Sequence, residues 1–471
     1  MTDGSEDFRF AEPSREIDYE PYRQTHQVPA WKNARHGFYR KAPPRDYGTR
    51  RFSDTDIYYS RAVMEEEWEK IWSKVWMIAG HLNDIPKPNA FMKVDRGPES
   101  VLVIRGKGDE VRAFYNVCQH RGVRLVTQDF GSAKKFVCPF HRWEYSSEGK
   151  NLFVTDRETF REEALCHDLN LKPVRSEVWR GWVFICFEKD AAPLTEFIGK
   201  DFIDRVAPYD MEKAIRIRDV EQVWDANWKV AHEAFIEPYH VQATHPQLVG
   251  AVDAYYPQID LFDHGHAFLI TQFMSPCTPY KDQLPEGVNE EHKIFLREAG
   301  LKEEDFPAHW QDVPEAIVKA KLARTDYGID YSKFSEGQLV DDWECGLFPT
   351  TELFLHPEGF FVQNWFPHPT DPEKCIYQVQ TYAVPGVSEL PSYMAVENFD
   401  VSGKKVLPRT YAASDDMEIL GPVIRQDCEL VPRTQQGMKS KGFEGSIYSE
   451  LEIRIRHWFD EYNRLMGRAA A

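Results

Sequence analysis

The sequence predicts an α+β fold in which a β-rich stretch precedes a longer mixed part. Between residues 76 and 188, short runs rich in β-branched and aromatic residues alternate with glycine-containing turns. Strand-like runs recur between residues 215 and 384, whereas segments within 280–340 and 446–466 follow helical periodicity. Strands and helices that gather in separate parts of one chain are typical of the α+β class.

The size and charge of the chain limit its domain organisation and its partners. At 471 residues it is long enough for two or three domains. We divide it into an N-terminal arm and helix at 1–75, a β-rich domain at 76–190 and a second domain at 191–471. A formal net charge of −19 argues against binding to nucleic acid or to an anionic membrane surface.

The sequence also predicts where the protein works. It has no run of about 18 apolar residues, so we expect no membrane span. The acidic N-terminal residues lack the apolar core of a signal peptide. Eight scattered cysteines in a long chain predict a reduced, cytoplasmic protein rather than a disulfide framework.

The first half of the chain begins with few regular elements. Residues 1–52 are rich in Pro, Arg and Tyr and predict an extended arm, with disorder as the alternative. Asp54 or Asp56 would cap a helix over about 57–74. The predicted strands that follow are Phe91–Val94, Ser100–Ile104, Val111–Asn116, Lys135–Val137 and Trp182–Phe187.

The second half mixes longer strands with helices. Strands are predicted at Ile215–Val223, Ala267–Met274, Glu352–Leu355, Gly359–Phe366 and Cys375–Val384, the last of which alternates and should be half-buried. Residues 280–340 form an excursion with helices at Glu290–Ala299 and Pro314–Ala323, which either covers a pocket or is a solvated insertion. Ser446–Met466 predicts an amphipathic helix whose buried stripe begins at Ile447.

The most specific motif lies in the β-rich stretch, where Cys118-Gln-His120 is followed by Cys138-Pro-Phe-His141. Each of two loops supplies one thiolate and one imidazole. Two thiolates on one iron and two imidazoles on the other is the arrangement that raises the potential of a [2Fe–2S] cluster. A structural zinc site is the alternative, but such sites usually pair cysteine with cysteine and histidine with histidine. The other cysteines have no ligand spacing and should be buried apolar residues: Cys166, Cys186, Cys277, Cys345, Cys375 and Cys428.

A second group of candidate ligands lies in the second half of the chain. His240 and His245 stand five residues apart, and Glu237 precedes the first by three. Two imidazoles and one carboxylate suit iron and leave positions open for oxygen and substrate. Glu237 is spaced to orient the His240 ring, and Pro238 should kink or restart the helix beside it. Because Pro246 biases His245 out of the α region, we expect that histidine at the helix exit. Taken alone, the pair fits an ordinary core or surface pair equally well.

Together, these segments resemble the α subunit of a Rieske non-haem iron oxygenase of the aromatic-ring-hydroxylating family, and the resemblance runs from about residue 55 to 467. The phrases Val-Arg-Ala-Phe-Tyr-Asn-Val-Cys-Gln-His-Arg-Gly and Cys-Pro-Phe-His-Arg-Trp are also of the family type. The resemblance implies that Cys118, His120, Cys138 and His141 hold a Rieske [2Fe–2S] cluster, and that His240 and His245 hold a mononuclear non-haem Fe(II).

The third iron ligand and the relay between the centres are also inferred from the resemblance. Asp427 precedes the phrase Gln435-Gln436-Gly437-Met438-Lys439-Ser440, which resembles the family stretch that follows the third ligand, and Asp415 and Asp416 are its rivals. Glu237 would be the relay between His240 and a cluster histidine of the next subunit, or would merely cap the helix that restarts at Pro238.

Three positions depart from the family pattern. Arg142 follows the second cluster histidine, where glycine is usual, and this changes the surface on which a partner would dock. Glu237 stands where the shorter Asp is usual. Ala234 stands where many members have Asn, so that amide has no role in this chain.

The resemblance implies an architecture and a reaction. A β-rich cluster domain would precede a catalytic domain in which helices wrap an antiparallel sheet, of the helix-grip type. Electrons from a ferredoxin, a flavin reductase or both would support O2-dependent mono- or dihydroxylation of an apolar small molecule, aromatic or polycyclic; oxidative demethylation is the alternative. A pocket could be lined by Phe268, Phe273, Phe361, Trp365 and Phe366, although plain core packing is the favoured role for each.

The assembly implied by the resemblance is a head-to-tail homotrimer, in which one subunit's cluster serves the neighbour's iron; an additional small β subunit stays open. Two rival functions also stay open. A non-catalytic Rieske electron carrier or sensor would use only residues 76–188, and a zinc hydrolase would use His240 and His245.

Overall fold

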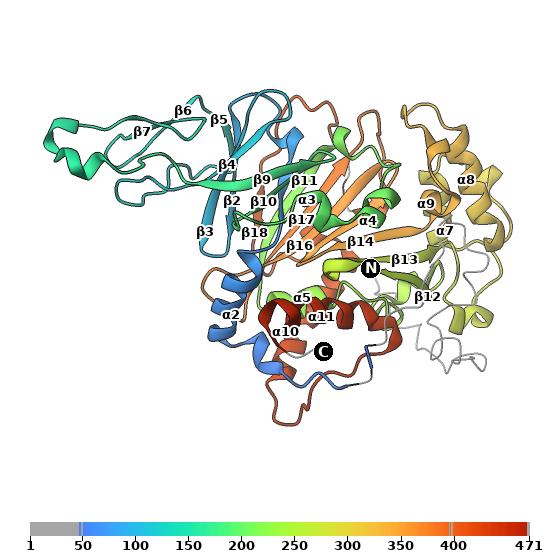
Figure 1. Ribbon diagram of the computed structural model, residues 1–471. Coiled ribbons are helices and arrows are strands. Elements are labelled where there is room, and N and C mark those ends of the chain that lie inside the picture. Colours follow the sequence, from blue (N-terminus) through green and yellow to red (C-terminus); the bar gives the residue numbers. More distant parts are fainter. Residues whose placement is uncertain (1–46, 49, 395, 397–398, 469–471) are drawn as a thin grey trace.

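The structure is a computed structural model that describes residues 47–48, 50–394, 396 and 399–468. Most of the predicted arm at 1–52 therefore lies outside the described residues. Figure 1 shows a smaller β-rich part, from which a three-stranded sheet projects, beside a larger part with one long sheet and most of the helices. Within the described part of the chain, no helix is long and apolar enough to cross a membrane.

The β-rich part contains a seven-stranded sheet in the order β1-β10-β9-β4-β3-β2-β5 and a three-stranded sheet in the order β6-β7-β8. Their bounds are β1 Met77–His81, β2 Ala90–Arg96, β3 Glu99–Arg105, β4 Val111–Tyr115, β5 Phe130–Ser132, β6 Lys135–Val137, β7 Glu144–Ser146, β8 Asn151–Phe153, β9 Pro173–Trp179 and β10 Trp182–Cys186. In β3, Val101 and Val103 pack into one core cluster, whereas Leu102 and Ile104 pack into another. Because side chains alternate along a strand, a continuous apolar run here fills two cores, one on each face of the sheet.

The larger part contains an eight-stranded sheet in the order β12-β13-β14-β15-β16-β17-β11-β18. Its strands are β11 Ile215–Trp224, β12 Val252–Leu261, β13 Ala267–Phe273, β14 Asp342–Leu347, β15 Thr351–His356, β16 Gly359–Pro367, β17 Cys375–Ala383 and β18 Thr410–Ala412. All neighbours are antiparallel except β18, which runs parallel to β11, so the predicted antiparallel sheet has one parallel edge. The half-buried prediction for Cys375–Val384 is wrong, because all but one residue of β17 is buried.

The helices are α2 Arg61–Glu67, α3 Leu194–Ile198, α4 Lys200–Arg205, α5 Trp228–Glu233, α6 Val241–Thr244, α7 Glu290–Glu298, α8 Val313–Ala323, α9 Glu336–Val340, α10 Pro422–Met438 and α11 Ile453–Met466. Ser60, and neither Asp54 nor Asp56, caps α2. The predicted excursion helices are confirmed as α7 and α8, which lie beside the β12–β14 end of the sheet (Figure 1). The predicted C-terminal helix begins later than expected, and Ile447 is 68% exposed, so its place on the buried stripe is wrong.

Helices α5 and α11 cover one face of the long sheet. Trp365 of β16 contacts His232 of α5, and Trp458 of α11 contacts the same histidine. Arg454 of α11 binds Glu344 of β14 and Glu352 of β15 on this face. We call the face that carries Trp365, Glu344 and Glu352 the helix-covered face.

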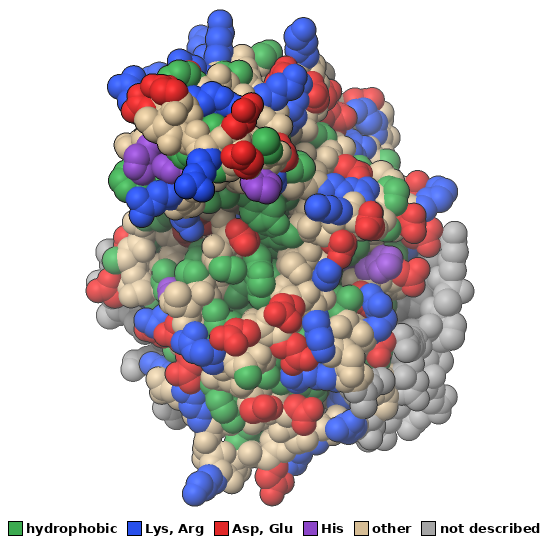
Figure 2. Space-filling view, turned by 60° about the vertical axis from the view of Figure 1, so that its left-hand side comes forward, with side chains coloured by type: hydrophobic (Ala, Val, Ile, Leu, Met, Phe, Trp, Pro, Cys, Tyr) green, Lys and Arg blue, Asp and Glu red, His purple; other side chains and the backbone are tan. Residues whose placement is uncertain are grey.

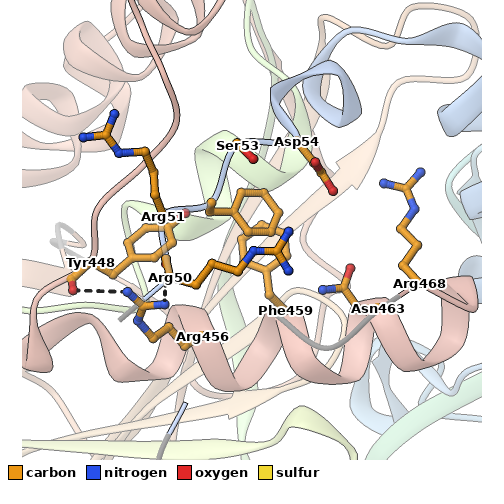
Figure 3. Close-up of a pocket in the computed structure, with 10 residues that line it drawn as sticks. Arg50, Arg51, Ser53, Asp54, Tyr448, Arg456, Phe459, Asn463 and Arg468 are labelled. Atoms are coloured by element: carbon orange, nitrogen blue, oxygen red, sulfur yellow. Dashed lines mark hydrogen bonds between the residues drawn. The ribbon is translucent and has the colours of Figure 1, made fainter. Parts of the chain in front are cut away.

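The start of the described chain lies against α11. Figure 3 shows this contact, which lines a small arginine-rich pocket. The Phe52 and Phe459 rings are 4.2 Å apart, and Phe52 pairs with Ser446 through backbone hydrogen bonds. The Arg456 guanidinium donates to the carbonyl oxygens of Arg50 and Tyr448. These contacts tie the chain before α2 to the last helix.

A buried ion pair joins α2, α5 and α11. The Lys229 Nζ lies 2.5 Å from Glu67 Oε1, and both side chains are essentially inaccessible to water. Glu67 also accepts hydrogen bonds from Trp228 Nε1 at 3.1 Å and Tyr462 Oη at 2.6 Å. A carboxylate with this many donors compensates the cost of burying its charge.

We expect Glu67→Ala to lower the free energy of unfolding by about 3 to 5 kcal/mol, because it leaves the Lys229 ammonium buried without its counter-ion. Urea unfolding followed by circular dichroism measures this loss. Glu65→Ala is the matched control, since Glu65 is exposed on the same helix and should change stability by less than about 0.5 kcal/mol. Equal losses in the two variants would contradict the role of the pair.

Candidate iron centres

The first candidate centre lies at the non-helical segment between α5 and α6. Asn227 caps α5, which ends at Glu233, and α6 begins only at Val241. This segment carries Glu237 and His240. Glu237 Oε2 accepts the backbone N–H groups of Tyr239 and His240 beyond Pro238, as a helix cap does. Its other oxygen, Oε1, lies 2.7 Å from His240 Nδ1. Glu237 therefore closes the turn at Pro238 that leads into α6, and it orients the His240 ring. The predicted helix start at Pro238 is wrong, because α6 begins at Val241 and has no side-chain cap.

The three predicted mononuclear ligands come together. The Nε2 atoms of His240 and His245 lie 3.5 and 3.1 Å from Asp427 Oδ1. One ligand atom from each of these three residues lies within 4.8 Å of the others. His245 occupies the end of α6, as predicted, and Asp427 projects from α10. The rivals Asp415 and Asp416 are exposed and do not join this group.

The donor set fits a divalent iron. Glu237 holds His240 Nδ1, and Gln426 Oε1 lies 2.8 Å from His245 Nδ1, so each ring directs its Nε2 toward Asp427. This is the arrangement by which neighbouring groups orient histidine ligands toward a metal. Two imidazoles and a carboxylate are the donors of a non-haem iron site with open positions. Sequence reasoning missed Gln426, whose only signal is that it directly precedes Asp427.

The charge around His240 also suits a cation. Burial lowers the pKa of His240, but the Glu237 and Asp427 carboxylates outweigh burial and raise that pKa to about 9. Carboxylates that stabilise a protonated imidazole would stabilise a bound metal ion in its place. The site is therefore electrostatically prepared for positive charge.

The four residues of the Cys-x-His and Cys-x-x-His loops also converge. Cys118 and Cys138 are buried, and the His120 and His141 ring centroids are 4.6 Å apart. Both Nδ1 atoms are buried and have no hydrogen-bond partner among the described residues. Two orphaned Nδ1 atoms beside two buried thiols fit a cluster with two sulfur and two nitrogen ligands, since buried polar atoms otherwise find partners.

Two aromatic residues support this second centre. The Trp143 ring stacks on His120 with centroids 4.9 Å apart, and Tyr145 Oη lies 3.4 Å from Cys118 Sγ. Burial raises the pKa of the Cys118 thiol, which a bound metal would overcome by holding the thiolate. Sequence reasoning missed Tyr145, whose position in a short alternating strand carries no ligand signal.

We expect Cys118→Ser or His141→Ala to remove the visible absorption of the cluster while iron stays at the second site. The cluster ligands come from two loops of the β-rich part, whereas the mononuclear ligands flank α6 and lie on α10, so loss of one set should leave the other intact. Iron and sulfide analysis with absorption spectra measures both centres. Loss of the mononuclear iron in either variant would show that the centres form one structural unit.

One smaller prediction about side chains fails, and the favoured core role of two aromatic residues is confirmed. Cys166 is exposed, whereas the other cysteines outside the motif are buried as predicted. Cross-strand partners share a face, and the register together with ring contacts places Phe268 and Phe366 on the face opposite the helix-covered one. Phe268 contacts Phe202 of α4 and Phe366 contacts Trp72, so both are core residues and cannot line a pocket beside the iron ligands.

The helix-covered face next to the iron ligands is both aromatic and charged. Phe361, Trp365 and Phe273 remain on this face by register. Arg454 binds Glu344 at its Nη1 and lies 2.7 Å from Glu352 at its Nη2. Burial raises the pKa of Glu344 to about 8, and this carboxylate in turn helps raise the pKa of His240, so it lies near the iron ligands.

Comparison with known proteins identifies the family. The model of the ring-hydroxylating α subunit catalytic domain matches residues 209–468, and that of the Rieske [2Fe–2S] domain matches residues 75–159. The chain is 31% identical to the large oxygenase component of the naphthalene 1,2-dioxygenase system of Pseudomonas fluorescens, over 84% of both chains.

Other relatives match over a shorter stretch. The chain is 32% identical to the 2-aminobenzenesulfonate 2,3-dioxygenase α subunit of Alcaligenes sp., over 48% of this chain and 58% of the relative. It is 33% identical to the glycine betaine monooxygenase oxygenase subunit of Pseudomonas aeruginosa, over 41% of this chain and 44% of the relative. These matches thus span about half the length of those relatives.

The fold is shared with solved structures. The quaternary ammonium Rieske monooxygenase CntA superposes with a TM-score of 0.60 at 20% identity, covering 88% of this chain and 96% of that one. A naphthalene 1,2-dioxygenase bound to phenanthrene superposes with a TM-score of 0.60 at 19% identity, covering 91% and 94%. With both domain models matched in order along one sequence, the chain belongs to the family of ring-hydroxylating α subunits, the Rieske non-haem iron oxygenases.

Proposed function

We propose that the protein is a Rieske oxygenase that uses O2 and electrons from a separate protein to oxidise a small organic molecule. The observation that carries this proposal is the group of His240, His245 and Asp427 in the same chain as the Cys118, His120, Cys138 and His141 site. A pure electron carrier has no use for the first group, and a zinc hydrolase has no use for the second. When bound, the mononuclear iron would supply O2 activation and the cluster would supply single electrons.

The residues of the chain prepare both sites. The Nε2 atoms of His240 and His245 and the Asp427 carboxylate would hold the mononuclear iron. Glu237 and Gln426 orient the two rings through their Nδ1 atoms. We propose that Glu237, which lies between the His240 ring and the surface at Tyr239, is also the positioning residue between this site and a neighbouring subunit's cluster histidine.

For the substrate, we propose an apolar molecule, aromatic or polycyclic, that lies against the helix-covered face and is mono- or dihydroxylated. Phe361 and Trp365 on that face support it, because aromatic rings favour flat apolar ligands. Two relatives of this chain are named for aromatic compounds, 2-aminobenzenesulfonate and naphthalene.

A second candidate is oxidative demethylation of a substrate with a cationic nitrogen. It is favoured by the aromatic side chains Phe361 and Trp365 on the same face. The faces of aromatic rings bind quaternary ammonium ions. Two similar proteins are named for glycine betaine and for quaternary ammonium substrates.

We further propose the partners and the organisation of the chain. The electron donor would be a ferredoxin, a flavin reductase or both, and the assembly a homotrimer, with or without a small β subunit. Figure 2 shows hydrophobic side chains in a hollow of one face, as a subunit contact requires. The domain bounds stay at 1–75, 76–190 and 191–471. Eight free cysteines support a reducing, cytoplasmic setting.

An iron count combined with O2 uptake tests this function. The oxygenase should hold about three irons per chain, two in the cluster and one at the histidine pair, whereas an electron carrier should hold about two. O2 uptake with reduced ferredoxin and reductase would then be followed across aromatics, terpenoids, steroids and quaternary amines, with the products identified. Two irons and no uptake with any substrate would refute the oxygenase.

A further inference from the structure

Arg142, directly after the cluster ligand His141, has a backbone conformation that residues other than glycine rarely adopt. Its φ is +59°, in the left-handed region where the Cβ atom crowds the backbone. The other ligand loop has the same turn: the N–H of Gly122 donates to the Cys118 carbonyl at 3.0 Å, as the N–H of Arg142 donates to that of Cys138. There the left-handed residue is glycine, with φ +80°, which adopts this conformation without strain. The second loop keeps a large charged residue where glycine would fit better.

For the other non-glycine residues with a left-handed backbone conformation, the residue type or contacts within the chain explain that conformation. Asn89 and Asp156 are of types that tolerate this region, and Met274 fills the core. Arg180 lies 3.1 Å from both the Ala207 carbonyl and Glu212, and His264 stacks on Phe197. By contrast, the exposed Arg142 guanidinium makes no hydrogen bond, ion pair or ring contact with any described residue. A strained position held without an internal partner indicates a function outside the chain.

The surroundings of Arg142 form a cationic and aromatic ridge. Phe140 is 53% exposed, and its ring centroid is 3.8 Å from that of His141. The exposed Arg121 guanidinium lies 5.2 Å above the Phe140 ring. We call Arg121, Phe140 and Arg142 the cluster ridge. Figure 1 shows that the sheet with β6 and β7, which borders this loop, projects from the body away from α5 and α10. The ridge is therefore directed away from this chain's own iron ligands.

The surface beside His240 carries carboxylates. Tyr239, next to His240, is 56% exposed, and Glu237 accepts its backbone N–H. Burial raises the pKa of Glu452, and the Glu237 carboxylate adds to this rise, so the two carboxylates are neighbours. We call Glu237, Tyr239 and Glu452 the iron mouth. It combines an exposed aromatic ring with carboxylates, which complements a ridge made of one aromatic ring and two guanidinium groups.

We infer that Arg142 is an inter-subunit docking residue, whose guanidinium pairs with carboxylates of the iron mouth of a second copy of this chain. The inference rests on the proposed function, because it needs a cluster on one subunit to face iron ligands on another. The charge complementarity between two surfaces of one sequence favours a second copy as the occupant. In this account the backbone strain at Arg142 is kept because glycine would place no charge at the interface.

The variant Arg142→Gly, in the full-length, cluster-loaded protein, distinguishes the effect of backbone strain at residue 142 from the effect of its charge on assembly. Loss of the left-handed strain should raise the melting temperature by about 1 to 2 °C. Loss of the charge should raise the protein concentration at which half of the assembly dissociates by about tenfold, and reduce the dependence of assembly on salt. It should slow reoxidation of the pre-reduced cluster by a similar factor. Sedimentation at several protein and NaCl concentrations, scanning calorimetry and single-turnover absorption measure the three effects.

Matched variants complete the test. Arg142→Lys keeps the charge and should retain most of the assembly, and Arg142→Asn removes the charge while tolerating the left-handed backbone. Arg180→Gly relieves the same strain elsewhere and should leave assembly unchanged, although it loses the contacts with Ala207 and Glu212.

Several results would overturn the inference. In one, Arg142→Gly and Arg142→Asn assemble and reoxidise like the parent protein. In another, both variants lose the cluster, which would make Arg142 a structural residue. In a third, only reduction by the external donor slows, which would place the electron carrier on the ridge. If the parent protein turns over substrate and the variants assemble and reoxidise as it does, only this inference is refuted. If the parent protein holds two irons and takes up no O2, the proposed function is refuted.

Discussion

Asp427→Ala is expected to remove the mononuclear iron and to lower turnover by more than about 100-fold, while the cluster remains. Loss of a group that only supports a ligand typically costs about 10- to 100-fold, and loss of a ligand should cost more. The physical reason is the geometry at α10, where Asp427 supplies the only carboxylate oxygen within 4.8 Å of both imidazole ligand atoms among the described residues. Iron analysis of the purified variant and product formation measure the effect.

Asp416→Ala is the matched control for this prediction. Asp416 is exposed, and its carbonyl rather than its carboxylate binds Gln222. Removal of a solvated carboxylate should leave both iron content and turnover within a factor of about two of the parent protein. If Asp416→Ala were the variant that lost iron, the third ligand would be misassigned.

Glu237→Gln should slow reoxidation of the pre-reduced cluster by orders of magnitude while the cluster, the iron content and the assembly state stay unchanged. The amide keeps one oxygen, so the cap on the N–H groups of Tyr239 and His240 can persist, with a loss of at most about 1 kcal/mol in stability. What is lost is the negative charge beside His240 Nδ1, which fixes that ring and faces the surface where a second subunit's cluster histidine would approach. Stopped-flow absorption after mixing the reduced protein with O2 and substrate measures the rate.

Glu237→Asp is the conservative variant, since it keeps the charge and shortens the reach. It should recover most of the rate that Glu237→Gln loses. These variants distinguish the two roles of Glu237. If Glu237 is only a cap, both variants should reoxidise the cluster at the normal rate. Unchanged reoxidation in Glu237→Gln would exclude the relay and leave Glu237 as a helix cap that also orients His240.

The sequence predicts the ligands well where chemistry is encoded locally. Cys118 and His120 share one loop and Cys138 and His141 another, so spacing suggests these pairs. His240 and His245 flank one short helix, and their assignment as ligands also depends on the cluster motif. Asp427 is far away in the chain, and only the resemblance of the stretch after it singled it out over Asp415 and Asp416. The physical reason is that α10 reaches the site through tertiary packing, which leaves no trace in local spacing.

Several outcomes that the sequence predicts wrongly or leaves open share one cause, which is that periodicity predicts a face but not what covers it. The alternation in Cys375–Val384 predicts that one face of the strand is exposed to solvent, but α5 and the neighbouring strands bury both faces. Phe268 and Phe366 have the chemistry of pocket residues, yet the register places them on the other side of the sheet from the iron ligands. Ile447 fits a helical stripe, but the helix begins only at Ile453. In each case the deciding contact comes from a distant part of the chain.

The carboxylate of Glu67 has a consequence for how the protein acquires and loses iron. It holds Lys229 of α5, eight residues before Glu237, and Tyr462 of the final helix. We therefore expect α2, α5 and α11 to unfold as one cooperative unit, and we expect binding of iron to the folded form to stabilise all three together. Deletion of C-terminal residues is then expected to lower the affinity for iron, although the deleted residues lie far from the iron ligands.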